Sequence, residues 1–168
     1  VSTSGIVHGL QPDCNTHDSS SYNICLDLKS LSGEFEPWMD SYAAARDRWE
    51  SVITGDDSSP WSLDWLGDNY VATAKPSSLD DIYIAGLEAD IDGLYGVLGS
   101  AGPTYGKSYG GSTHALTGWM EFDTVDISWL MAEGKWNNVI LHEMAHVFGI
   151  GTLWGYNGVY SGSGNQYT

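Results

Sequence analysis

The sequence predicts an α+β domain, because segments with strand character and segments with helical character follow one another irregularly along its 168 residues. Apolar side chains alternate with polar ones at 22–28 and at 119–123 (WMEFD), which is typical of half-buried strands. Apolar side chains recur at helical spacing at 34–53, and a second helix is expected at 136–148. A chain of this length has enough material for one sizeable core, so we expect a single domain that spans 1–168.

The N-terminal half is expected to hold one long helix and two strands. Residues 1–21 are rich in Ser, Thr, Asp and Gly and are expected to be irregular. In the helix at 34–53, Pro37 occupies the first turn, where its missing N–H is tolerated. The stretch 58–78 has the composition of a loop, whereas 81–87 (DIYIAGL) has the β-branched and aromatic content of a buried strand.

The C-terminal half contains more turns. Residues 93–111 include seven glycines and one proline, which indicates a turn-rich connection rather than an element. After the strand at 119–123 we expect one short helix at 126–133. From Gly155 onward the residues show no hydrophobic period, so we expect an irregular tail.

The charge of the chain excludes some classes of partner. There are 22 acidic and six basic residues, which gives a formal net charge of −16. Nucleic acid and anionic membranes both bind through Lys and Arg, so neither is expected as a partner. No apolar run approaches the roughly 20 residues that a membrane span needs. Two interpretations of the acidic residues remain: a solubilising extracellular surface, or clusters that hold calcium.

One segment resembles the beginning of a calcium loop. Glu88, Asp90 and Asp92 alternate and are followed by Gly93, as in a calcium-binding turn. However, the position that should carry the bidentate glutamate is Gly99. We therefore expect a turn without calcium.

The two cysteines bear on the compartment. Cys14 and Cys25 lie close together in a chain that has no other thiol, which favours a local disulfide over a redox or metal-binding pair. The sequence shows no signal peptide, yet it begins at Val1 rather than Met, as in a processed product. We expect the protein to be secreted or at the cell surface.

The segment LHEMAHVFG carries the candidate chemistry. His142 and His146 are four residues apart, so in a helix both imidazoles lie on one face and can reach one Zn²⁺ ion. Glu143 lies beside the open position of such an ion, where it can take a proton from a zinc-activated water. This pattern predicts a metal site with His142 and His146 as ligands and Glu143 as the catalytic base.

The surroundings of this motif support the prediction. Asn137 or Asn138 can cap the N-terminus of the helix, and Gly149 and Gly151 stop it at the other end. Apolar residues flank the motif on both sides. The alternative is a pair of surface histidines on an ordinary amphipathic helix, with no metal.

The run HEMAHVFGIG resembles the metzincin pattern, in which a glycine after the second histidine turns the chain toward a third histidine ligand. In the short form of that pattern the third ligand would stand at Thr152, so the short form fails. The longer stretch VILHEMAHVFGIGTLW (139–154) is similar to the leishmanolysin-like branch, in which an insertion precedes the third histidine. Three further stretches, AAARDRWESVITGD (43–56), DIDGLYGVLGSAGP (90–103) and MEFDTVDI (120–127), resemble other parts of that family.

The resemblance implies a zincin-like (metzincin-like) N-terminal lobe. Its parts would be a small twisted mixed sheet, a backing helix at about 34–53 and the zinc-binding active-site helix beneath the sheet. It also implies a zinc endopeptidase, whose extended peptide or protein substrate lies along an edge strand above the metal. Residues 119–123 are the candidate edge. No histidine follows His146 and no methionine follows Met144, so we expect the third ligand and the Met-turn to belong to a C-terminal lobe of a longer enzyme.

The other histidines and two acidic residues near the motif are not expected to take part in catalysis. His8, His17 and His114 are expected to be surface residues, with His114 as the one possible substitute ligand. Glu121 and Asp123 are expected to be structural or to flank the substrate. A catalytically inactive extracellular structural or binding module that keeps the zincin fold remains an alternative function, as does a zinc hydrolase of substrates other than peptides.

Overall fold

The computed structural model describes residues 21–28, 36–56, 59–65 and 76–160, and the segment 1–20 lies outside them. The described elements are β1 (Ile24–Leu28), α1 (Glu36–Glu50), β2 (Trp61–Ser62), β3 (Ser78–Leu79), β4 (Ile82–Ala89), β5 (Gly99–Tyr109), β6 (Ser112–Asp123), α2 (Thr124–Ala132) and α3 (Trp136–Phe148). The chain is therefore an α+β protein, as the sequence predicts.

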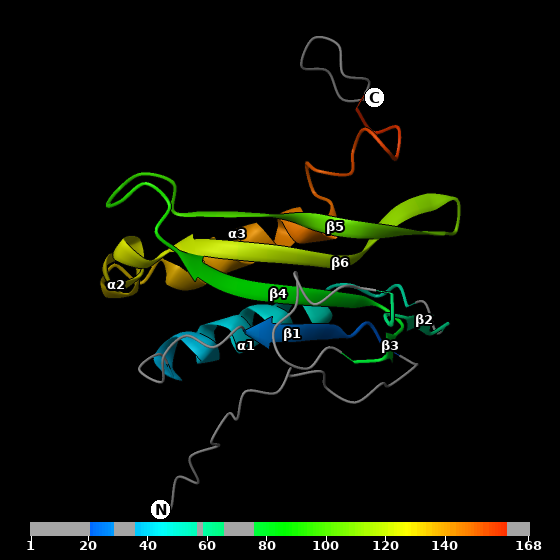
Figure 1. Ribbon diagram of the computed structural model, residues 1–168, viewed down its shortest axis with the longest axis horizontal. Coiled ribbons are helices and arrows are strands. Elements are labelled where there is room, and N and C mark those ends of the chain that lie inside the picture. The colour runs from blue at the N-terminus through cyan, green and yellow to red at the C-terminus, as the bar shows by residue number, and fades with distance from the viewer. Residues whose placement is uncertain (1–20, 29–35, 57–58, 66–75, 161–168) are drawn as a thin grey trace, which may run out of the picture.

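Four strands form one small mixed sheet, in the order β1-β4-β6-β5 (Figure 1). Strands β1, β4 and β6 run parallel, and β5 runs antiparallel to β6. The helices α1 and α3 cover one face of this sheet. The short antiparallel pair β2 and β3 belongs to the other side.

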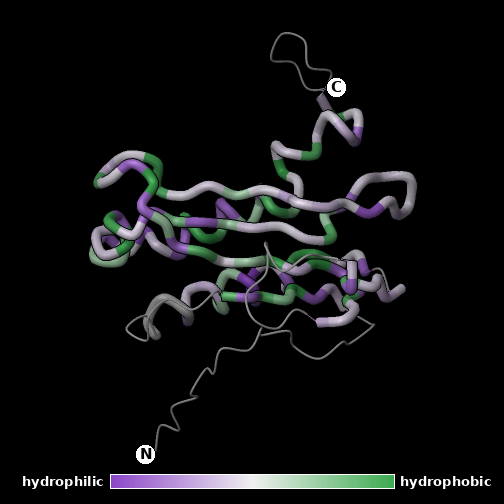
Figure 2. The backbone as a smooth tube through the Cα atoms, viewed as in Figure 1, coloured by the Kyte–Doolittle hydropathy of each residue, from purple (hydrophilic) through white to green (hydrophobic). Residues whose placement is uncertain are grey.

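Each face of the sheet has its own apolar cluster, because successive strand residues point to opposite faces. The helix-facing cluster combines strand residues with residues from all three helices: Ile24, Leu26, Tyr42, Ala45, Ile82, Ile84, Ala115, Met120, Phe122, Ile127, Leu130, Trp136, Ile140, Met144, Val147 and Leu153. The opposite cluster consists of Cys25, Leu63, Leu79, Tyr83, Ala85 and Leu116. Figure 2 shows hydrophobic residues along β4 and in the turn that leads to β5, where Leu94, Tyr95 and Val97 are exposed.

Several sequence predictions are confirmed. The strand predicted at 22–28 is β1, the helix at 34–53 contains α1, and the strand at 81–87 corresponds to β4. The helix predicted at 136–148 has the bounds of α3. Within the predicted loop 58–78, the described residues add the two short strands β2 and β3.

The prediction of a turn-rich connection at 93–111 is wrong for most of that segment, because β5 occupies 99–109. Three of its glycines lie within the strand, and backbone hydrogen bonds to β6 hold them there. Pro103 is tolerated because β5 is an edge strand with a register irregularity next to that residue. Gly110 and Gly111, both with positive φ, form the tight turn to β6.

The prediction that 119–123 is the edge strand is also wrong. These residues are the last part of the longer strand β6, which is hydrogen-bonded to β4 on one side and to β5 on the other. The edge on that side of the sheet is β5. The alternation at 119–123 indicated a strand, but alternation does not give the position of a strand within the sheet.

The N-cap predicted for α3 is wrong as well. The cap is Lys135, which makes no side-chain hydrogen bond to the helix. The Lys135 N–H bonds to the Leu130 carbonyl at 2.8 Å and the Gly134 N–H bonds to the Met131 carbonyl at 3.0 Å, which closes α2. Since α3 begins directly after this closure, neither Asn137 nor Asn138 stands at the capping position.

The acidic turn at 90–93, before β5, is held by hydrogen bonds to the Asp123 side chain. The Oδ2 atom of Asp123 accepts the N–H groups of Ile91, Asp92 and Gly93 at 3.1, 2.9 and 3.0 Å. Its Oδ1 atom accepts the Val125 N–H at 3.0 Å and so caps α2. Asp123 is therefore structural, which is one of the two roles that the sequence left open.

The pKa of Asp123 is lowered because backbone N–H groups hydrogen-bond to its charged form, that of Asp92 most strongly. A lowered pKa contributes stability above the ordinary value near 3.8, and this contribution is lost as the pH falls through the folded-state pKa. We expect Asp123→Asn to lower the melting temperature at pH 7 by at least a few degrees and to flatten the loss of stability below about pH 4. Thermal unfolding followed by circular dichroism at pH 7 and pH 3 measures both. The exposed Asp40→Asn on α1 is the control, and equal behaviour of the two variants would contradict this role.

Cys25 is buried on β1 and is disulfide-bonded. The described residues include no free cysteine. Its predicted partner Cys14 lies outside the described residues, so the Cys14–Cys25 pairing stays a prediction.

Within the described ranges, no helix is long and apolar enough to cross a membrane.

Candidate metal centre

The helix α3 packs closely against the sheet. It lies against β5 and β6, where Gly118 of β6 faces Val147. A Cβ atom at Gly118 would lie 2.4 Å from Val147 Cγ1 and 2.8 Å from the Gly102 carbonyl oxygen. Only a glycine permits this approach, which fixes the depth of the helix at the residue that follows His146.

The structure brings His142 and His146 together. Their Nε2 atoms are 3.1 Å apart, and their rings are perpendicular with centroids 4.7 Å apart. His142 is exposed and His146 is partly exposed, so both can be reached from solvent. With Zn–N distances of about 2.0–2.1 Å, two atoms at this separation subtend an angle of about 100° at a shared ion, near the value for a tetrahedral site. The separation of the two Nε2 atoms therefore suits a shared zinc ion.

The end of α3 fixes the protonation of His146. Gly149 adopts φ 108°, and the Ile150 N–H bonds back to the Ala145 carbonyl at 3.0 Å. This reversal brings the Ile150 carbonyl oxygen to 2.8 Å from His146 Nδ1. Since a carbonyl can only accept, Nδ1 carries the proton and the lone pair of a neutral His146 lies on Nε2. That is the tautomer a metal ligand needs.

Thr152, which the short metzincin pattern would replace by a histidine, supports the same turn. Its Oγ1 atom donates to the His146 carbonyl at 2.7 Å. Neither this role nor that of the Ile150 carbonyl was predicted from the sequence. The glycine break was the available signal, because a left-handed residue at Gly149 returns the next residues to the last turn of the helix.

Glu143 lies one residue after the first imidazole and is 7% exposed. Burial raises the pKa of its carboxyl group, and the nearby His142 and His146 oppose this shift. Its carboxylate oxygens do not form a group with both Nε2 atoms within 4.8 Å. Such a placement fits a base beside the site better than a ligand.

A third protein ligand is not found in the part of the chain that the structure describes. No His, Cys, Asp or Glu ligand atom of those residues lies within 4.8 Å of both Nε2 atoms. His114 is exposed on β6, where its ring contacts Tyr109 with centroids 6.3 Å apart. His8 and His17 lie outside the described residues.

The acidic candidates on β6 do not join the histidines. Glu121 alternates with Met120 and Phe122, which belong to the helix-facing cluster, so it points to the opposite face from α3. The two carboxylate oxygens of Asp123 accept hydrogen bonds from four backbone N–H groups, as described above.

Another group of acidic residues could hold a cation. Carboxylate oxygens of Asp56, Asp80 and Asp81 lie within 4.8 Å of one another. Burial raises the pKa of Asp81 to about 6, and a hydrogen bond from the Asn23 backbone opposes the shift. Lys107 donates to the Asp80 carbonyl next to them. An all-oxygen group suits calcium or magnesium rather than zinc. The calcium-like segment singled out in the sequence, at 88–93, is a different one.

Comparison of the chain with protein-family models, with curated proteins and with solved structures gives no significant match.

Proposed function

We propose that the protein is a zinc-dependent endopeptidase with a metzincin-like N-terminal lobe, similar to the leishmanolysin-like enzymes. The observation that carries the proposal is the pair of Nε2 atoms 3.1 Å apart on one face of α3. The buried Glu143 in the turn between them supplies the third functional group. The small mixed sheet backed by α1, with α3 against its β5 side, supports the lobe that the sequence resemblance implies.

The residues have distinct tasks. A zinc ion bound there would supply a polarising charge and lower the pKa of a water molecule to about 7. His142 and His146 would hold the ion through Nε2, and the Ile150 carbonyl keeps His146 in the matching tautomer. Glu143 takes a proton from the water and passes it to the leaving amine.

We assign the substrate to the β5 edge rather than to β6. An extended peptide can add to an exposed strand edge through main-chain hydrogen bonds, with specificity from alternate side chains. β5 ends the strand order on the side where α3 packs, whereas both sides of β6 are occupied. We propose a secreted or cell-surface protein, whose remaining metal ligand comes from outside the described residues, as the resemblance implies.

A catalytically inactive binding module is the second candidate. It is favoured by one observation, that the described residues hold two nitrogen ligands rather than three. The peptidase and the binding module would share one fold, but only the peptidase would hydrolyse peptides.

Removal of the metal tests the proposal. The protein, incubated with a generic protein substrate, is expected to lose peptide hydrolysis when a zinc chelator is added and to regain it when zinc is restored. Appearance of new N-termini measures turnover. Hydrolysis that persists after the protein has been shown to be metal-free would contradict a zinc peptidase. Zinc binding without any hydrolysis would favour the inactive module.

A further inference from the structure

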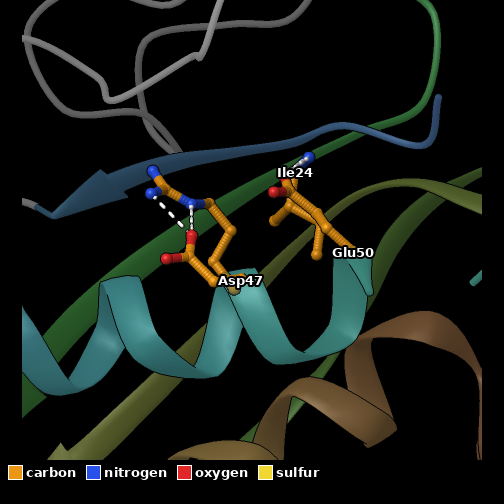
Figure 3. Close-up of polar contacts among 4 residues, drawn as sticks. Ile24, Asp47 and Glu50 are labelled. Carbon is orange, nitrogen blue, oxygen red and sulfur yellow. Dashed lines mark hydrogen bonds and ion pairs between the residues drawn. The ribbon is translucent and has the colours of Figure 1, made fainter. Parts of the chain in front are cut away.

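The last turn of α1 lies between the first strand and the candidate metal helix. On one side, Glu50 Oε1 accepts the N–H of Ile24 on β1 at 2.8 Å. Figure 3 shows this contact, with Asp47 on the same side of α1 and the ribbon of α3 on the other side. The Arg46 guanidinium donates to Asp47 Oδ1 at 2.9 and 3.0 Å. The Glu50–Ile24 hydrogen bond therefore ties this turn to the edge strand β1.

On its other side the same turn contacts α3 through Trp49. The indole Nε1 atom of Trp49 donates to the Leu141 carbonyl at 3.3 Å. The indole ring also meets Phe148 edge to face, with centroids 5.0 Å apart and planes at 70°. Phe148 in turn contacts Tyr22, with centroids 6.2 Å apart.

These two contacts enclose the candidate metal centre along the helix. Leu141 directly precedes His142, and Phe148 follows His146 by two residues. The Leu141 carbonyl is also the helical acceptor for the Ala145 N–H, in the turn that sets the spacing of the two imidazoles. One side chain of α1 thus holds α3 just before the first imidazole and just after the second.

We propose that Trp49 is a positioning residue that fixes the rotation of α3, and with it the direction of His142 and His146, relative to the sheet. The inference rests on the proposed zinc function. The indole ring alone would pack α3, but the directional hydrogen bond to Leu141 also sets its rotation. Residues that orient metal ligands without touching the metal typically change metal affinity by about 10–100-fold when replaced.

Trp49→Phe tests this, because phenylalanine keeps an aromatic ring and loses the N–H donor. We expect a zinc affinity about tenfold lower or more, measured with zinc alone in competition with a chromophoric chelator. The cobalt-substituted protein should show an altered visible spectrum, a change that loss of packing alone would not produce. Trp129→Phe is the matched control. That tryptophan is also half-buried, and its ring contacts Tyr95 and Lys135 outside the His142–His146 turn.

These measurements distinguish failure of the proposed zinc function from failure of the positioning role of Trp49. If the unmodified protein binds no zinc, the proposed function fails and this inference fails with it. If it binds zinc and Trp49→Phe binds zinc within about twofold of the unmodified protein, the positioning role alone is overturned. Should circular dichroism show Trp49→Phe to be unfolded, Phe148→Leu replaces it. That variant removes the ring that Trp49 contacts and leaves the hydrogen bond to the Leu141 carbonyl, so zinc affinity should stay within about twofold of the unmodified protein. A loss of about tenfold in the folded Phe148→Leu protein would show that ring packing, and not the hydrogen bond, positions α3, and would overturn the role.

Discussion

Replacement of Glu143 by glutamine is expected to abolish the proposed peptide hydrolysis while zinc stays bound. The amide has the shape of the carboxylate but cannot accept a proton, so the water is not activated and the leaving amine is not protonated. Loss of a general base typically costs about 10²–10⁴ in rate. Turnover of a peptide substrate, measured beside the zinc content of the same sample, gives both quantities. Near-normal turnover with zinc bound would show that Glu143 is not the base.

Replacement of His146 by alanine is expected to remove both metal and activity. The Nε2 atom of His146 is one of two nitrogens, 3.1 Å apart, that face the proposed ion. Its loss should lower zinc affinity by more than about 100-fold, the upper end for residues that merely support a ligand. Equilibrium dialysis against zinc and the peptide assay measure the two losses.

His114→Ala is the matched control for this variant, because His114 is an exposed histidine on β6 that does not share the site. It should keep zinc and activity. A His146→Ala protein that retained both would refute the ligand assignment. Together, Glu143→Gln and His146→Ala separate the base from the ligand.

The candidate site could be predicted from sequence because its geometry is local. His142 and His146 are one helical turn apart, so the helix alone brings them to one face. The C-terminal bound of α3 followed from a glycine stop at Gly149, whose φ of 108° ends the helix. The N-terminal bound was close even though the predicted asparagine cap was wrong.

The contacts around the site could not be predicted in the same way. The hydrogen bond from Trp49 to the Leu141 carbonyl joins residues 92 positions apart, and no local pattern encodes it. The contact between His146 and the Ile150 carbonyl depends on the direction in which the chain leaves Gly149. Both arise from tertiary packing rather than from periodicity.

The strand β5 shows why part of the fold escaped prediction. Its glycines and Pro103 have low strand propensity, and the partner strand β6 supplies the hydrogen bonds that hold them extended. Gly110 and Gly111 were a usable signal, since two glycines between extended runs are typical of a hairpin turn. Recognition of that hairpin would have placed 119–123 inside the sheet, next to β5, rather than at the edge.

Whether His142 and His146 bind zinc can be seen in a crystal structure of the protein grown with zinc, with anomalous data collected at the zinc edge. We expect one anomalous peak about 2.0–2.1 Å from Nε2 of both His142 and His146. Glu143 should lie beside that peak without binding it. A protein that carries no zinc at α3, or that takes up the ion among Asp56, Asp80 and Asp81 instead, would contradict it.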